Sequence, residues 1–387
     1  MPSCKESPSY SGAGNNRRLA GHDALLLPGG RVSSFWQSAG YDVYWEGLVF
    51  ASGIPSGPES VKVFVAELEK KGIEDACGML KGIYFFVIES RKSGDIHAFI
   101  DNSGLYHAFY TPRRVSSSFL ELARHEGLAA SDFDPDAVVE FLHFGSLFSF
   151  GTYLPPIRRI RHDDIIRLSR QGGKLTFAKK NGTGICSPPD SPSVTFEQFF
   201  HETAASLCNR RVSIDLTGGV DTRLVAAMFD RCGLQFETAS SGGTPEYEDI
   251  SLSRPVARAL GHPWFATIHS ASGLERDMGD ILLATDGLYD VLYYHRLYQL
   301  QKDRKKRGVD TMISGAGGEL FKDFWWLHEF PFYRRGASDI ERFVDMRVMS
   351  FGPMRGILTG AFDDAAFNLK RNLVRSFSQY ALDTNTR

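Results

Sequence analysis

Two glycine-rich segments of the chain each contain a carboxylate and each follow a short apolar run. The first is Thr217 to Thr222 and the second is Ser314 to Glu319. Glycines leave backbone N–H groups open to an anion, and the positive end of a following helix attracts the same anion. Asp221 and Glu319 would repel bare phosphates, but both become favourable where a Mg²⁺ ion lies between them and the phosphates. The pattern therefore predicts a site for a magnesium-bound polyphosphate.

Each segment has a simpler interpretation when it is taken alone. The first is an ordinary glycine-rich turn before a helix or a nucleotide loop, and we favour the nucleotide loop because Thr217 and Thr222 add hydroxyl groups. It is not a Walker loop, since GxxxxGK followed by Ser or Thr does not occur in the chain. Glu319 alone is either a metal ligand or a solvated carboxylate at a helix start. Two such loops facing each other across a sheet favour the metal interpretation.

The second half of the chain alternates between strands and helices. The pattern predicts strands at 212–216, 236–240, 265–269 and 311–314, and helices at 222–229, 249–260, 273–284 and 289–306. Pro255 lies inside one of these helices and should kink it or delay its start. The alternation indicates a parallel α/β sheet, in which ligands bind at the carboxyl ends of the strands. Both glycine-rich segments fall at such strand ends.

The first half is predicted to be a separate α+β unit. Its expected strands are 41–45, 48–50, 82–88, 96–100, 108–110, 163–168 and 174–178, and its expected helices are 61–71 and 135–142 after an Asp134 cap. Residues 1–40 begin with a Gly/Ser-rich stretch and are expected to be partly disordered. Residues 181–194 are rich in Gly, Ser and Pro and are the expected linker. The predicted domains are therefore 41–180 and 195–387.

Composition and net charge limit which other classes of function are expected. The net charge of −2 and the pI of about 6.6 give no electrostatic reason to expect nucleic acid or an anionic membrane as a partner. Five scattered cysteines without a CxxC pair argue against a disulfide framework and a zinc site. No apolar run reaches the length of a membrane span, so we expect a cytoplasmic protein. The basic run 302–307 is interpreted as a solvated helix end, and the oligomeric state stays open.

The two loops resemble those of the asparagine synthetases and their relatives, which are N-type ATP pyrophosphatases. Asp215 to Leu224 is similar to the family's DLSGGLDSR stretch, with Thr in place of both serines of SGGxDS, and 314–319 is similar to its SGxGxD loop, with Glu in place of Asp. Residues 246–262 resemble its acid-rich segment, which ends in "LG-H". The resemblance implies Mg²⁺ ligation by Asp221 and Glu319, with Ala239 against the adenine. The implied ATP-binding residues are Leu216, Thr217, Gly218, Gly219, Asp221, Thr222, Ala239, Ser314 and Gly315.

The resemblance extends into the first half. Gly78 to Ile88 resembles the family's "G-x-F-A-F" strand, Asp101 to Tyr110 resembles "RDxxGxRPLYY", and Phe141 to Arg158 resembles the segment that leads into the synthetase domain. Family membership implies a degenerate N-terminal-nucleophile glutaminase domain of α+β type. This domain is followed by a parallel-sheet synthetase domain of the adenine-nucleotide α-hydrolase-like kind.

The chain also departs from the family pattern. Pro2 stands where working glutaminases carry the nucleophilic Cys, and Cys4 would serve only after removal of the residues before it, so we expect no glutamine hydrolysis. Ala316 replaces a Glu that asparagine synthetases typically carry, which puts aspartate in doubt as the substrate. The family's downstream Lys has no counterpart by position. We therefore expect either a sequence truncated after Arg387 or an incomplete catalytic apparatus.

These features predict an ATP-dependent carbon–nitrogen ligase that uses ATP and Mg²⁺. It would activate a small-molecule carboxylate as an acyl-adenylate, release pyrophosphate and form an amide with an amine or ammonia. Two alternatives stay open: a glutamine-dependent asparagine synthetase, and a catalytically inactive nucleotide-binding partner protein. The sequence assigns no catalytic residue.

Overall fold

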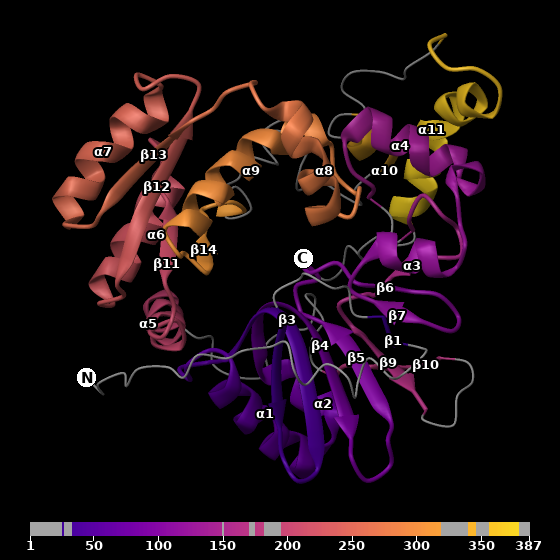
Figure 1. The fold of residues 1–387 in the computed structure, drawn as a ribbon, viewed down its shortest axis with the longest axis horizontal. Helices are drawn as coiled ribbons and strands as arrows, with labels where there is room; N and C mark the ends of the chain where they lie inside the picture. Colours follow the sequence, from indigo (N-terminus) through magenta and orange to yellow (C-terminus); the bar gives the residue numbers. More distant parts are fainter. Residues whose placement is uncertain are drawn as a thin grey trace.

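The computed structural model describes residues 25–26, 33–148, 151–169, 175–181, 195–318, 340–345 and 356–378. These residues form an antiparallel six-stranded sheet, a small four-stranded sheet and a parallel four-stranded sheet. Figure 1 shows the six-stranded sheet and the parallel sheet in separate parts of the molecule, with the long helix α9 (Val291–Lys306) running between the parallel sheet and α4 (Pro135–Phe144). The expected linker, 182–194, lies outside the described residues.

The six-stranded sheet has the order β10-β9-β5-β4-β3-β2. Its strands are β2 (Ser33–Gln37), β3 (Tyr41–Ala51), β4 (Leu80–Ser90), β5 (Ile96–Ile100), β9 (Asp164–Leu168) and β10 (Thr176–Lys179). The two strands expected at 41–45 and 48–50 are one strand, β3. Gly47 allows this continuity, because it has φ 85° and a Cβ there would lie 2.3 Å from the Ile83 carbonyl oxygen. The sheet also begins at Ser33, inside the segment expected to be partly disordered.

Helix α1 (Pro58–Lys71) covers one face of this sheet, followed by the short α2 (Ile73–Ala76) and a 3₁₀ turn (Cys77–Met79). Proline at the first turn and lysines in the last turn favour helix ends at these points, and Gly72 with φ 83° stops the helix. Val61, Phe64 and Val65 recur at helical spacing and are buried. The Phe64 ring meets that of Phe86 edge-on at 5.2 Å, which anchors α1 on β4.

The small sheet has the order β1-β7-β6-β8, and helix α3 packs beside it. Its strands are β1 (Leu25–Leu26), β6 (Phe109–Tyr110), β7 (Val115–Ser116) and β8 (Arg158–Arg159). Helix α3 (Phe119–His125) follows β7, and a 3₁₀ turn (Ala130–Asp132) leads to α4. The Asp134 carboxylate accepts a hydrogen bond from the Asp136 backbone nitrogen, so the predicted cap of α4 is confirmed.

The second half contains the parallel sheet, as the sequence predicts. Its order is β13-β12-β11-β14, and its strands are β11 (Val212–Asp215), β12 (Phe236–Gly242), β13 (Trp264–Ile268) and β14 (Thr311–Ile313). The helices besides α9 are α5 (Phe196–Ser206), α6 (Val220–Arg231), α7 (Glu248–Leu260) and α8 (Leu274–Ala284). Every strand and helix expected between 212 and 314 is present, with ends shifted by a few residues.

The expected delay of α7 by Pro255 is wrong. The helix begins at Glu248 and continues through the proline to Leu260. Proline removes only its own N–H donor, and the carbonyl that this donor would have bonded belongs to Ser251. Ser251 and Pro255 are both exposed, so that carbonyl is open to solvent and the cost to the helix is small.

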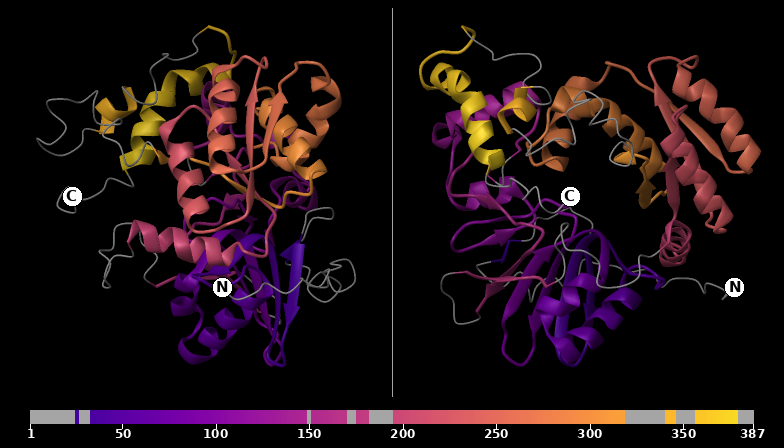
Figure 2. Two further views of the ribbon diagram at one scale, coloured as in Figure 1. Left: turned by 90° about the vertical axis from the view of Figure 1, so that its left-hand side faces the viewer. Right: turned by 180° about the vertical axis from the view of Figure 1, so that it is seen from behind.

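The last helices among the described residues pack on the first half. Helix α11 (Ala361–Ser378) contacts α4, and α10 (Ile340–Phe343) contacts α11. Their shared core consists of Val139, Val344, Ala365, Ala366, Leu369 and Leu373. Figure 2 shows α11 and α4 side by side, away from the parallel sheet. Burial of each large aliphatic side chain in this core contributes about 1.5–3 kcal/mol to stability. Because α4 precedes the expected linker and α11 follows it, this core joins the two halves of the chain.

Candidate nucleotide-binding site

The two glycine-rich loops lie against each other. Strands β11 and β14 are parallel neighbours, with Ile214 opposite Ile313, so the segments that follow them leave the same edge of the sheet. A Cβ added to Gly315 would lie 2.8 Å from Thr222 Cγ2 and 2.9 Å from the Thr222 backbone nitrogen. A Cβ added to Gly318 would lie 2.6 Å from Asp221 Cγ. Since the loops touch at these glycines, no larger residue fits there without moving one of them.

Threonine side chains close the first loop. Thr217 Oγ1 lies 2.9 Å from Thr222 Oγ1, and the Thr217 backbone nitrogen donates to the same Thr222 oxygen at 3.1 Å. The Gly219 nitrogen donates to Thr217 Oγ1 at 3.1 Å. Helix α6 then begins at Val220, and its N-cap residue, Gly219, offers no side chain to its first amide groups. An uncapped helix N-terminus beside hydroxyl groups is an arrangement that binds phosphate.

One amide group of the first loop already binds a carboxylate. The Gly218 nitrogen donates to Asp249 Oδ1 at 3.0 Å, and a Cβ on Gly218 would lie 2.7 Å from Leu252 Cδ1. The first turn of α7 therefore covers the start of the loop. Asp249 was not among the residues predicted from the sequence, although its position in the acid-rich segment after β12 was a usable signal. A phosphate on this amide would take the place that the Asp249 carboxylate holds.

Buried hydroxyl groups support the loop from the sheet side. Ser240 Oγ donates to the Leu216 carbonyl at 2.5 Å and lies 2.6 Å from Ser253 Oγ, which also accepts from Trp264 Nε1 at 3.0 Å. The Leu216 nitrogen donates to the Ala239 carbonyl at 2.9 Å. The Ala239 side chain is 2% exposed, so protein atoms cover it, and its expected contact with adenine stays a prediction. The network fixes Leu216, the residue immediately before the loop.

Arg304 ties α9 to the strand below the first loop. It is 1% exposed, forms an ion pair with Asp215 and donates from Nε to Ser213 Oγ at 3.1 Å. Arg307, on the next turn, pairs with Glu237 at 2.7 Å. The interpretation of 302–307 as a solvated helix end is therefore wrong for these two arginines. Because their carboxylate partners lie on β11 and β12, only the packing of α9 on the sheet brings them together.

The position of Asp221 suits the role of a magnesium ligand. Its carboxylate group lies at the contact between the two loops, next to Gly318 and half-buried. Glu319, the second expected ligand, lies outside the described residues. In the part of the chain that is described, no three His, Cys, Asp or Glu side chains gather as a metal site. Mg²⁺ on a nucleotide uses only one or two protein carboxylates together with phosphate oxygens, so Asp221 meets this requirement for one ligand.

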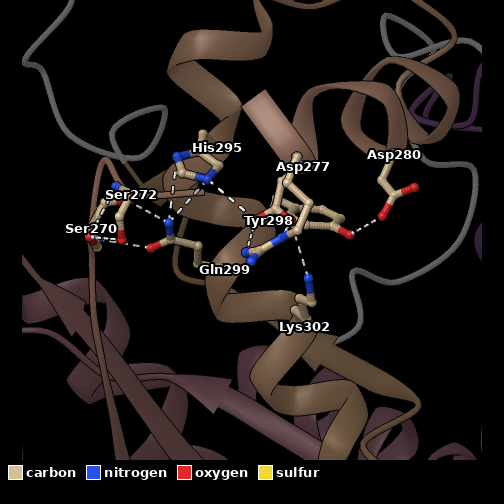
Figure 3. A network of polar contacts seen from close by, with 9 residues as sticks. Ser270, Ser272, Asp277, Asp280, His295, Tyr298, Gln299 and Lys302 are labelled. Atoms are coloured by element: carbon tan, nitrogen blue, oxygen red, sulfur yellow. Dashed lines mark hydrogen bonds and ion pairs between the residues drawn. The ribbon is translucent and has the colours of Figure 1, made fainter. Parts of the chain in front are cut away.

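A polar network holds α8, α9 and the loop after β13 together (Figure 3). Asp277 is 3% exposed and pairs with Arg276 at 3.1 Å, Lys302 at 3.3 Å and His295 at 3.5 Å. The hydrogen bond from Arg276, followed by that from Lys302, lowers the pKa of Asp277 to about 2. Gln299 extends the network by donating to the Ser270 carbonyl at 2.6 Å. These contacts position the carboxyl end of β13, which is a third strand end at the ligand edge of the sheet.

The fold and the loops define an α/β domain whose ligand edge lies at the carboxyl ends of a parallel sheet. Residues 203–379 match the model of the asparagine synthase family, which supports the assignment of this segment to the asparagine synthetase family. The match also supports an ATP-utilising ligase. None of the curated protein sequences compared with the chain matches it. The N-terminal-nucleophile fold expected for 41–180 stays a prediction.

Two solved structures illustrate what the chain is similar to. One is the glutamine-dependent NAD⁺ synthetase from Acinetobacter baumannii in complex with ADP, with 16% identity over 42% of this chain and 32% of that one and a TM-score of 0.24. The other is the NH3-dependent NAD synthetase from Campylobacter jejuni in complex with nitrate, with 12% identity over 47% of this chain and 93% of that one and a TM-score of 0.25. The match thus spans about a third of the length of the Acinetobacter enzyme. No helix among the described residues is long and apolar enough to cross a membrane.

Proposed function

We propose that the chain is an ATP-dependent ligase that activates a carboxylate as an acyl-adenylate, releases pyrophosphate and forms an amide. The family assignment of 203–379 supports the amide-forming, ATP-using part of this proposal. The observation that carries the rest is the contact of the two glycine-rich loops, where Gly315 meets Thr222 at adjacent strand ends. Such a junction supplies amide groups, hydroxyl groups and a carboxylate to one triphosphate.

In the proposed reaction, a carboxylate oxygen attacks the α-phosphorus of ATP. The bond from that phosphorus to the bridging oxygen breaks, and pyrophosphate leaves with the electron pair. Amide groups of Gly218, Gly219 and Gly315 and hydroxyl groups of Thr217, Thr222 and Ser314 hold the phosphates in place. By the family resemblance, Leu216 and Ala239 would lie on the nucleoside side of the site. Mg²⁺ bound by Asp221 and Glu319 would neutralise the charge on pyrophosphate.

The second step forms the amide. The lone pair of an amine or ammonia attacks the acyl carbon of the adenylate, AMP leaves with the electrons of the acyl–oxygen bond, and the nitrogen loses a proton. A dry site favours this outcome because water would otherwise hydrolyse the adenylate. The identity of both substrates is open. Ala316, in place of the Glu that asparagine synthetases typically carry, weighs against aspartate as the carboxylate.

ATP–pyrophosphate exchange with a panel of carboxylates tests the proposal. We expect magnesium-dependent exchange of labelled pyrophosphate into ATP with at least one carboxylate, and little exchange without any. The absence of both exchange and ATP binding would contradict the proposal. ATP binding without exchange for any carboxylate would favour the inactive partner protein. Asparagine formed from aspartate, ATP and glutamine, with release of glutamate, would instead favour the glutamine-dependent asparagine synthetase.

A further inference from the structure

A pocket of about 600 Å³ lies where α4 meets the start of α9, apart from the glycine-rich loops. Its volume falls in the range of small-molecule sites, which is roughly 300–1,000 Å³. Both halves of the chain contribute to it. The described aromatic rings that line it are Phe141, Phe144, Tyr289, Tyr293 and Tyr294. Such a lining stacks well on a planar ring.

The walls of the pocket are preformed. The ring of Tyr289 is stacked on that of His107 at 5.7 Å between centroids, with an interplanar angle of 10°. The Tyr294 ring lies 4.9 Å from that of Tyr289. Helix α4 ends at Gly145 in the left-handed conformation, with φ 70°, and a Cβ there would lie 3.6 Å from Asp290 Cβ. The close approach of these two helix ends sets the width of the pocket.

The charge of the lining favours a cation. Asp290 is the carboxylate among the described lining residues, and none of them is Lys or Arg. Burial lowers the pKa of His143, so its imidazole is neutral near pH 7. The carboxyl end of α4, which carries the negative end of the helix dipole, opens on the same space. The opposing N-terminus of α9 is capped by Asp290, whose Oδ1 accepts from the Leu292 nitrogen at 2.8 Å.

We propose that this pocket binds an aromatic amine in its protonated form. The ring lies among the tyrosine and phenylalanine side chains, and the ammonium group lies near Asp290 and over a tyrosine face. A carboxylate of the same shape is disfavoured, since it would meet Asp290, and no Lys or Arg is among the described residues that line the pocket. This inference goes beyond the proposed ligase activity and does not depend on ATP use.

Isothermal titration calorimetry of the full chain without nucleotide tests the preference. The probes are phenethylamine, 3-phenylpropanoate and 2-phenylethanol, which share a ring and a two-carbon spacer and differ in charge. We expect phenethylamine to bind at least about tenfold more tightly than 3-phenylpropanoate, with the alcohol between them. Equal or tighter binding of the carboxylate would overturn the proposal, and so would the absence of heat with all three probes.

Two variants assign the binding to this pocket. Asp290→Asn removes the charge but keeps a side chain that caps α9, and it should weaken phenethylamine by about tenfold while leaving the alcohol unchanged. Tyr293 is 76% exposed, so Tyr293→Ala should fold normally and weaken all binding probes. Asp364→Asn and Leu283→Ala change exposed residues elsewhere and serve as matched controls. Unchanged affinity in both pocket variants would show that the amine binds at another place, which overturns the assignment.

Discussion

The side-chain oxygens of Thr217 and Thr222 lie 2.9 Å apart and close the first glycine-rich loop across its ends. Thr222 is also the residue that Gly315 of the second loop touches. The hydroxyl pair therefore holds the shape of the first loop, and the methyl group and backbone nitrogen of Thr222 lie where the second loop meets it. The proposed phosphate site depends on this pair because both loops must keep their spacing to bind one nucleotide.

The first prediction concerns the hydroxyl group of Thr222. Thr222→Val keeps the shape of the side chain but removes the oxygen that accepts from the Thr217 nitrogen and that shares a hydrogen bond with the Thr217 hydroxyl group. We expect the dissociation constant for magnesium ATP to rise by about tenfold, as the loss of one or two hydrogen bonds implies. Thr222→Ser keeps the oxygen and is the matched control. Equal affinity of the valine and serine variants would show that the hydroxyl group has no part in binding.

The second prediction tests the contact between the loops. Gly315→Ala places a methyl group 2.8 Å from Thr222 Cγ2 and should force the loops apart, which lowers ATP affinity by about tenfold or more. Gly243→Ala is the control, because a Cβ there meets no atom within 4 Å. Calorimetric titration with magnesium ATP measures both variants. A Gly315→Ala protein that binds ATP as tightly as the Gly243→Ala protein would contradict the proposed site.

The third prediction concerns Asp286, a buried residue with φ 52° whose Oδ1 accepts from Ser118 Oγ at 2.6 Å. The hydrogen bond joins the first half of the chain to the segment between α8 and α9. Asp286→Ala loses this bond and places alanine in the left-handed region, so it should lower the free energy of unfolding by about 2–4 kcal/mol. Asp286→Asn tolerates the same backbone and should cost less. Urea unfolding gives both values, and equal losses would refute the backbone argument.

The fourth prediction concerns the pH dependence of stability. Burial, with a smaller effect of Arg159, lowers the pKa of His107 from 6.5 to about 4. Between these two values the unfolded chain binds a proton that the folded chain does not, so this contribution to the free energy of unfolding falls as pH falls from 6.5 to about 4. It is fully present above pH 6.5. His107→Phe keeps a ring for stacking on Tyr289 and should remove this part of the acid loss.

Urea unfolding at several pH values between 4 and 8 checks the fourth prediction. The wild-type and His107→Phe profiles should run parallel near pH 8, where any constant offset reports packing alone. Toward pH 4 the free energy of unfolding of the wild type should fall relative to that of the variant, since only the wild type loses the His107 contribution. Profiles that stay parallel over the whole range would show that His107 is not held neutral by the fold.

The sequence was sufficient for the elements that depend on neighbours in the chain. Glycine spacing, alternating strands and helices, and the Asp134 cap predicted the parallel sheet, α4 and the two loops at strand ends. That both loops lie at one edge of the sheet also followed, because parallel strands end at one edge. Their adjacency required the strand order, which places β11 beside β14. Two local predictions differed from the structure. Strand β3 continues through Gly47 because it is paired with β4, and α7 starts before Pro255 because the carbonyl that loses its donor faces solvent.

Tertiary structure decided which residues meet. Arg304 belongs to a basic run that the sequence alone predicts to be a solvated helix end. Only the packing of α9 on β11 buries it against Asp215. Asp249 at the first loop, Ser118 beside Asp286, and α11 on α4 join segments far apart in the chain. No spacing rule encodes such pairs, because their energy arises from burial and hydrogen bonds that exist only after the chain has folded.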